Sequence, residues 1–282
     1  MKTDSSLAEI FIEFKWDTAD DPFSTGASLI HGTIRGDDSL GQITSYVAVQ
    51  LGAQFRTHAY FVFVLRGTAR ILRWDRSGMI VTEAFEYNTL PYLTNFFRRY
   101  SLASQAMRGK DDTASDPTPS EAHTTRKALG LDRKVPLVKL SIPGTNSNLL
   151  YFVTGTPEAS VYTPPGRATH GFEAYDISHS RTVFLKDSWR IDAEGIQPEG
   201  EVYQTLRSAN VPHVPHCLAS GDVSTGVYHS TTTWKYASAT WAQHSHTSST
   251  HFLSHRHYRL ALDIIGRILV DFHSSYEMVG AV

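Results

Sequence analysis

The chain has 282 residues, of which 41% are apolar and 19% charged, with a formal charge of −2 at neutral pH. This length suffices for two modest domains, and the near-zero charge excludes a strongly basic nucleic-acid binder. Because the sequence has no run of about 18 apolar residues, we expect no membrane span, and a single cysteine, Cys217, indicates a reducing intracellular compartment, the cytoplasm or nucleus.

The first hundred residues predict a small α/β domain, which we place at residues 1–103. Four segments have the apolar pattern of strands, namely 10–16, 60–65, 69–74 and 79–84. The last two flank Asp75-Arg-Ser-Gly78, a polar turn typical of a hairpin. Apolar residues at helical spacing predict helices over 39–54 and 93–101.

A polar stretch follows this domain, and we interpret residues 104–130 as a flexible linker or insertion. Residues 104–125 contain no aromatic and no β-branched apolar side chain. Such a composition buries too little apolar surface to offset the entropy of ordering the chain.

Residues 131–282 predict a second domain built mainly from strands. Five segments have a strand-like pattern, namely 135–142, 148–153, 166–176, 181–189 and 258–265, and residues 198–208 predict a helix. The run 231–257 is of low complexity and rich in Ser, Thr and His. We interpret it as a loop, with an insertion at about 231–256.

Two motifs in the second domain are typical of phosphate binding. Gly166-Arg-Ala-Thr-His-Gly171 matches G-x-G-x-x-G at its first and third glycines, and small residues let backbone N–H groups approach phosphates. Val183-Phe-Leu-Lys186 follows and is close to V-A-I-K, whose lysine meets the α- and β-phosphates of ATP. Each motif also has a simpler interpretation, a hairpin turn or a strand-end lysine in solvent.

The predicted helix supplies acidic residues that could hold this lysine by an ion pair. Counting back from Val211-Pro-His-Val214 favours Glu201 as the partner, with Glu199 as the alternative. Acidic residues also favour any helix N-terminus. Residues 257–266 then supply a strand and a glycine-bearing connector, where a kinase has the hinge that binds adenine.

Six sequence blocks resemble the fungal-type protein kinase-like family, from about residue 9 to the C-terminus. They are Gly41-Gln-Ile-Thr-Ser-Tyr46, Gln54-Phe-Arg-Thr-His58, Ala69-Arg-Ile-Leu-Arg-Trp-Asp-Arg-Ser-Gly78, Phe184-Leu-Lys-Asp-Ser-Trp-Arg190, Val211-Pro-His-Val-Pro215 and His257-Tyr-Arg-Leu260. The resemblance implies an α+β fold in which the second domain is a kinase-like N-terminal lobe, with a five-stranded antiparallel sheet and one main helix.

The resemblance also implies ATP-dependent phosphorylation of protein serine or threonine, with ATP and Mg²⁺ as cofactors and a protein as substrate or partner. Gly166 and Gly171 would cradle phosphates, Lys186 would contact the α- and β-phosphates, and Glu201 would form the ion pair. Nucleic acid is not an expected partner.

The catalytic part of a kinase is not found in this sequence. No H-R-D-like or D-F-G motif follows Gly266, so we expect a fragment without the large lobe, with neither a catalytic residue nor a metal ligand. The alternative, from a different class, is a non-catalytic binding or scaffold module, a pseudokinase fragment.

A second possible site lies in the first domain. Glu13 and Lys15 lie two apart on a predicted strand, and Gln42 follows on the predicted helix, an order similar to PD-(D/E)xK nucleases. Such a nuclease also needs an upstream aspartate as metal ligand, and the candidate Asp4 lacks the preceding proline. We therefore interpret this nuclease-like unit as a relic site rather than as a metal-dependent nuclease.

The histidine-rich run could also indicate a zinc site, through His244, His246, His251, His255 and His257. It contains no cysteine, and the pattern favours a solvated insertion, so we predict no metal there. Cys217 is interpreted as a small buried hydrophobe on a strand rather than as a nucleophile.

Overall fold

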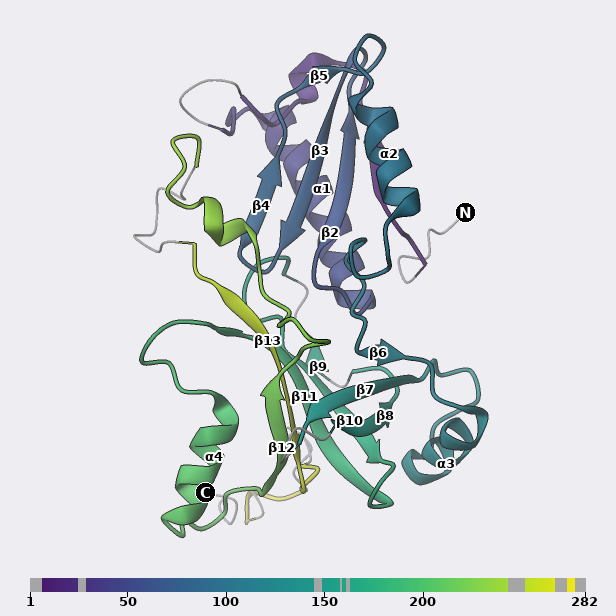
Figure 1. Ribbon diagram of the computed structural model, residues 1–282, viewed down its shortest axis with the longest axis vertical. Helices are drawn as coiled ribbons and strands as arrows, with labels where there is room; N and C mark the ends of the chain where they lie inside the picture. The colour runs from purple at the N-terminus through teal and green to yellow at the C-terminus, as the bar shows by residue number, and fades with distance from the viewer. Residues whose placement is uncertain are drawn as a thin grey trace.

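The computed structural model describes residues 7–24, 29–144, 149–157, 159–160, 163–242, 252–266 and 273–276. Within these residues the chain forms two sheets, each with its own helices, one above the other in Figure 1. No helix of this described part has the length and apolar character needed to cross a membrane.

The first unit is a mixed sheet between two helices. Its strands are β1 (Phe11–Phe14), β2 (Ala59–Val64), β3 (Thr68–Asp75) and β4 (Gly78–Val81) in spatial order, with β5 (Phe85–Glu86) beside β3. Only β1 and β2 run parallel; the other pairs are antiparallel. This arrangement confirms the strands and helices predicted for the first hundred residues.

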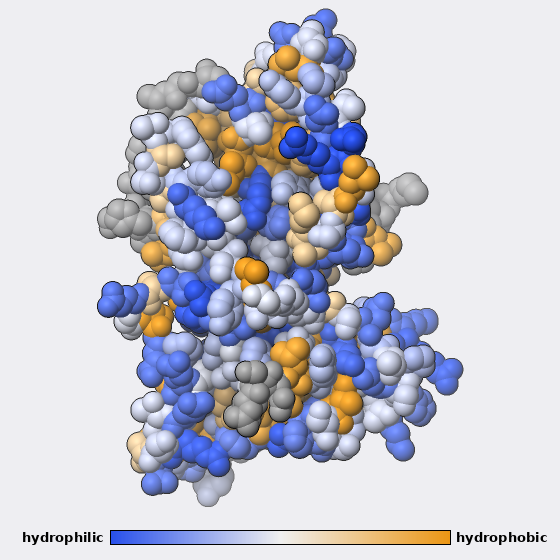
Figure 2. Space-filling view, viewed as in Figure 1, coloured by the Kyte–Doolittle hydropathy of each residue, from blue (hydrophilic) through white to orange (hydrophobic). Residues whose placement is uncertain are grey.

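The two helices of this unit cover opposite faces of its sheet. Helix α1 (Ile34–Ala53) contributes Ile43, Val47 and Leu51 to one buried cluster, and α2 (Tyr92–Leu102) packs Phe96 on the other face. Their amphipathic spacing directs one apolar stripe of each helix to the sheet. Apolar side chains gather on the upper half of the face shown in Figure 2, over this sheet.

The second unit is an antiparallel sheet of eight strands. They are β6 (Ala114–Ser115), β7 (Val138–Pro143), β8 (Leu149–Thr154), β9 (Ala159–Ser160), β10 (His170–Asp176), β11 (Arg181–Ile191), β12 (Cys217–Asp222) and β13 (His255–Leu262). The spatial order is β12-β13-β11-β10-β8-β7-β6, with β9 on β10. The expected five-stranded sheet was too small: the five predicted segments form β7, β8, β10, β11 and β13, and β6, β9 and β12 add to β7, β10 and β13.

This second sheet is curled around an apolar core. A Cβ at Gly221 of β12 would lie only 2.9 Å from Pro143 Cβ at the end of β7, so strands that are distant in the sheet order face each other. The inside is filled by buried apolar side chains: Leu140, Ile142, Phe152, Phe172, Val183, Leu185 and Ala261. On the opposite face, Tyr203 of helix α4 (Glu199–Ser208) packs on a second cluster that includes Leu260.

The polar stretch between the units contains regular structure that its composition did not predict. Besides β6, it forms helix α3 (Pro119–Leu129). Thr118 and Glu121 form a complete capping box, and Gly130 ends the helix at φ +63°. These are strong local helix signals, and they act where low apolar content suggested a flexible segment.

The prediction of a loop over residues 231–257 was wrong at both ends, where the structure has a short helix and the start of a strand. A short 3₁₀ helix, η3 (Thr233–Tyr236), lies near its start, and β13 already begins at His255. His244, His246 and His251 lie outside the described residues. The described part before residue 243 reaches up to the first unit, where η3 lies beside β4 (Figure 1).

The predicted hairpin turn between β3 and β4 is confirmed, and it also joins the two units. Asp75 accepts hydrogen bonds from the backbone N–H groups of Thr232 (2.7 Å) and Thr233 (3.0 Å). Arg76 is buried and donates to the carbonyl oxygen of Pro164 at 3.1 Å. The turn therefore holds two segments of the second unit, the start of η3 and the connection between β8 and β10.

Acidification should weaken the first unit through His58. Its imidazole is buried with Nε2 3.3 Å from Met107 O, and burial lowers its pKa from 6.5 to about 4. The unfolded chain binds this proton below about pH 6.5, whereas the folded chain does so only near pH 4. Stability from His58 therefore falls as the pH drops through this window, by up to about 3 kcal/mol.

Urea denaturation at pH 7 and at pH 4.5 measures this loss in the wild type and in His58→Gln. The glutamine cannot be protonated, so the variant should lose distinctly less stability between the two pH values than the wild type. Equal losses in both proteins would show that His58 does not carry the effect.

Candidate functional site

Lys186 and Glu199 form an ion pair on one face of the second sheet. Lys186 lies in β11, and its Nζ donates to both carboxylate oxygens of Glu199, at 2.7 and 2.9 Å. The two side chains are 22% and 29% exposed, so the pair is reachable from solvent. An ammonium has three N–H donors, and two of them point at this carboxylate.

The partner of Lys186 is thus Glu199 and not Glu201, which the sequence analysis favoured. Two residues along an α-helix correspond to a rotation of about 200°, so these two glutamates point in nearly opposite directions. Glu199 is the first residue of α4 and faces the sheet, whereas Glu201 is exposed.

The start of α4 lies directly on the sheet because residue 200 is a glycine. The N–H group of Gly200 donates to the Tyr258 hydroxyl at 2.9 Å. A Cβ at this position would lie 1.9 Å from Ser220 Oγ and 2.7 Å from the Tyr258 hydroxyl. This close approach sets the rotation of α4 and places Glu199 over Lys186.

The two candidate glycines have different surroundings. Gly171 lies within β10, where it pairs with Lys186 of β11. Gly166 has φ +102°, and its N–H donates to Arg76 O at 2.8 Å. The N–H of Gly166 is therefore engaged by the first unit, and phosphate cradling by these two glycines stays a prediction.

A second cation lies beside the ion pair. The guanidinium of Arg167 is 3.8 Å from the Glu199 carboxylate and is more than half exposed. Its backbone is fixed by a hydrogen bond from Trp189 N to Arg167 O at 2.7 Å. Lys186 and Arg167 thus place two positive charges around the single negative charge of Glu199, a setting that suits a phosphorylated ligand.

A buried charged cluster occupies the other face of the same strands. Asp187 follows Lys186 and points to the opposite face, as strand alternation requires. It accepts hydrogen bonds from His257 Nε2 and Arg259 Nε, both at 2.7 Å. Burial would raise the pKa of Asp187, but the neighbouring His257 and Arg259, which both donate to its carboxylate, hold the pKa well below its usual value.

Arg259 connects this cluster to the polar stretch between the units. Its side chain is 0% exposed and also binds Asp111 through Nη2 and Thr113 Oγ1 through Nη1. Sequence reasoning did not single out Asp187, Arg259 or Asp111. Two of them belong to quoted family blocks, Phe184–Arg190 and His257–Leu260, but only the fold shows that these blocks meet.

Glu13, Lys15 and Gln42 also come together, in the first unit. Lys15 Nζ lies 2.7 Å from Gln42 Oε1 and 3.0 Å from Glu13 Oε1. Asp4 lies outside the described residues. The hydrogen bond from Lys15 to Gln42 joins the end of β1 to α1. Among the described residues, no group of three metal-binding side chains includes Glu13.

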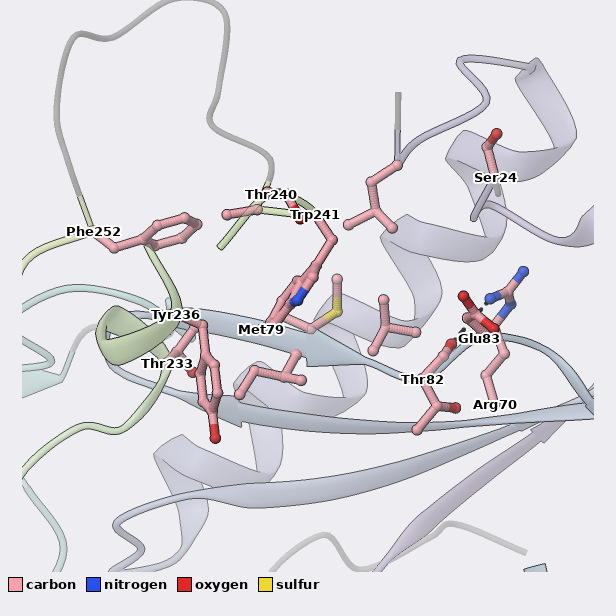
Figure 3. Close-up of a pocket in the computed structure, with 14 residues that line it drawn as sticks. Ser24, Arg70, Met79, Thr82, Glu83, Thr233, Tyr236, Thr240, Trp241 and Phe252 are labelled. Carbon is pink, nitrogen blue, oxygen red and sulfur yellow. Dashed lines mark hydrogen bonds between the residues drawn. The ribbon is translucent and has the colours of Figure 1, made fainter. Parts of the chain in front are cut away.

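Two cavities lie away from Lys186 and Glu199. Figure 3 shows a pocket of about 520 Å³ at β4, into which Met79, Tyr236, Trp241 and Phe252 project. Lys186 is not among its lining residues. A second cavity of about 570 Å³ lies between the units, on the Asp187 face of the second sheet.

Cys217 is half-buried in β12, and burial raises the pKa of its thiol, which suits a packing role.

Comparison with known proteins gives one family. The sequence model of the family described as fungal protein kinase matches residues 31–282. No curated protein and no solved structure matches the chain. The match covers the ion pair of Lys186 and Glu199, the Asp187 cluster and most of the first unit, so the chain belongs to the fungal protein kinase family.

Proposed function

We propose that the second unit binds a nucleotide, as the ATP-binding small lobe of a protein serine/threonine kinase. The observation that carries the proposal is the ion pair between Lys186 of β11 and Glu199 of α4. Kinases require a strand lysine held by a helix glutamate, because the lysine must meet the α- and β-phosphates in a fixed position. Membership of the family implies ATP and Mg²⁺ in general terms.

The residues around the pair support phosphate binding. Glu199 would orient the ammonium, whose third donor would bind a phosphate oxygen, and Arg167 would add a second positive charge. The sequence contains no H-R-D-like or D-F-G motif, which supply the base and the metal ligands in kinases. The proposal for these residues is therefore nucleotide binding, and binding is what the experiment measures.

One observation favours a second candidate, a non-catalytic binding module. The N–H group of Gly166 is bound to Arg76 O, and the Arg76 guanidinium holds Pro164 O. Backbone that is tied to the first unit has fewer donors for phosphates. In this alternative the chain recognises a protein partner and needs no nucleotide.

Glu199→Gln should remove nucleotide binding, whereas Glu201→Gln should not. ATP at about 100 times its dissociation constant stabilises a protein by about 2.7 kcal/mol, which raises the melting temperature by several degrees. The wild type and Glu201→Gln should show this rise. In Glu199→Gln and Lys186→Ala it should be absent, because the phosphate-binding ammonium is no longer held or no longer present.

Thermal denaturation with ATP, with and without Mg²⁺, checks this result. The two glutamate variants lose the same charge from the same helix, and Glu199 but not Glu201 contacts the cations Lys186 and Arg167, so they are matched controls. No shift in the wild type would favour the binding module. Equal shifts in all four proteins would place the nucleotide away from the ion pair.

A further inference from the structure

We propose that Asp111, His229 and His257 bind one divalent transition-metal ion, for which zinc is the probe. The Nδ1 atoms of the two histidines lie 3.4 Å apart. Asp111 Oδ1 lies 3.8 Å from the first Nδ1, and Asp111 Oδ2 lies 3.9 Å from the second. Among the described residues this is the one group of three side chains with metal-binding atoms this close together.

The hydrogen bonds of the two imidazoles turn their free nitrogens toward each other. His229 Nε2 lies 2.9 Å from Asp112 Oδ1, and His257 Nε2 lies 2.7 Å from Asp187 Oδ1. A carboxylate accepts, so each Nε2 donates, and in a neutral imidazole the Nδ1 then presents a lone pair. With both imidazoles neutral, a cation between the two Nδ1 atoms offsets the repulsion of their lone pairs, and a proton on one Nδ1 that is donated to the other would do the same.

Metal-binding histidines have this same outer arrangement. Their second nitrogen usually donates to a carboxylate, which fixes the tautomer and makes the first nitrogen a stronger ligand. Here both histidines have it, through two different aspartates. The rings are also held by stacking: Trp189 lies parallel to His257 with centroids 4.9 Å apart, and the His229 ring lies within 16° of parallel to His257 with centroids 5.7 Å apart.

The distances favour a tetrahedral ion over an octahedral one. Ligands at about 2.0–2.1 Å from a tetrahedral zinc ion are about 3.3–3.4 Å from one another. Octahedral ligands at the same bond length are only about 2.9 Å apart. The two Nδ1 atoms, 3.4 Å apart, match this tetrahedral edge. The Asp111 carboxylate lies farther out, since its Oδ1 is 3.8 Å from one Nδ1 and its Oδ2 is 3.9 Å from the other, so it has to turn or move toward the ion to bind it through one oxygen.

The charged groups around Asp111, His229 and His257 also favour a divalent cation. Three carboxylates (Asp111, Asp112 and Asp187) and one guanidinium (Arg259) contact the group or its histidines, which gives a net charge of −2 with neutral histidines. Asp111 and Asp187 are buried. The buried carboxylates of Asp111 and Asp187 with the buried Arg259 guanidinium leave one negative charge unpaired, which is costly, and the exposed Asp112 adds a second, so one divalent ion would balance the group.

The ligands come from three segments that are far apart in the sequence. Asp111 belongs to the stretch that joins the units, His229 follows β12, and His257 lies in β13. The cavity of about 570 Å³ between the units is lined by Asp111 and His257, so a fourth ligand can reach the ion from there. An ion at this place would fasten the connecting stretch to the second sheet.

Zinc titration of the full chain, first stripped with EDTA, tests the proposal. We expect one equivalent to bind, to raise the melting temperature, and to give the intense visible spectrum of a tetrahedral Co²⁺ site when cobalt replaces zinc. His229→Gln should weaken binding by about 100-fold or more. Asp112→Asn, which changes only the outer partner of His229, should weaken it by about 10–100-fold.

The histidine-rich run is the necessary control, because it could bind zinc by itself. The triple variant His244→Ala, His246→Ala, His251→Ala should keep the equivalent and the cobalt spectrum. Loss in the triple variant with retention in folded His229→Gln would overturn the proposal. No stoichiometric binding in the wild type would overturn it as well and would assign a proton, not a metal ion, to the space between the two Nδ1 atoms.

Discussion

Replacing Arg259 with methionine should lower the free energy of unfolding by about 3–5 kcal/mol. The guanidinium is fully buried and lies between Asp187 and Asp111, so its removal leaves two buried carboxylates without their cation. Breaking a buried pair on one side is far more costly than losing an exposed one. Methionine keeps most of the side-chain volume, so the loss reports on charge rather than on a cavity.

Arg256→Met is the matched control, three residues earlier on the same strand. Its guanidinium is partly exposed and binds Asp222 and Asp192, while Asp222 also keeps Arg190. We expect a loss of about 1 kcal/mol or less. Urea denaturation in EDTA, which removes any effect of bound metal, measures both. Similar losses in the two variants would mean that Arg259 is no more important than a surface cation.

Gly200→Ala should destabilise the second unit, because the added methyl group has no room. The new Cβ would lie 1.9 Å from Ser220 Oγ and 2.5 Å from Ser220 Cβ, so α4 or β12 has to move. Overpacking of this kind costs about 1–3 kcal/mol. The displacement also separates Glu199 from Lys186, so the nucleotide-induced rise in melting temperature should disappear.

The same substitution at Gly41 should have the opposite sign. Gly41 lies inside α1, and a Cβ there would meet nothing within 4 Å. Alanine favours a helix interior over glycine by about 0.5–1 kcal/mol, so Gly41→Ala should be neutral or stabilising. Thermal denaturation of both variants checks the contrast, and a stable Gly200→Ala with intact nucleotide binding would contradict the close packing of α4.

Apolar patterning was enough to predict most of the strands and the long helices. The runs at 60–65 and 181–189 are recovered as β2 and β11, and helices α1, α2 and α4 lie where apolar spacing placed them. These signals are local, because burial on one face or both faces of an element shapes its sequence directly. Helix α3 has equally local signals in its caps, and the polar composition around it concealed them.

Contacts between distant segments could not be predicted in this way. The choice between Glu199 and Glu201 depends on how α4 is rotated, and Gly200, Ser220 and Tyr258 set that rotation from three different elements. Likewise, Asp187 and Arg259 meet because β11 and β13 pair in a particular register. Register follows from the whole sheet, so neither residue stood out within its own segment.

The hydrogen bonds of Arg76 to the connection between β8 and β10 couple the motions of the two units. A hairpin of the first sheet and the backbone around residues 163–166 move as one piece, because the guanidinium binds that backbone on one side and Leu51 O on the other. Any force that tilts the first sheet is therefore transmitted to residues 163–166, which directly precede Arg167 beside the ion pair. Cutting the gene between the two units would release residues 163–166 from Arg76, so the second unit expressed alone would differ from the same residues in the intact chain.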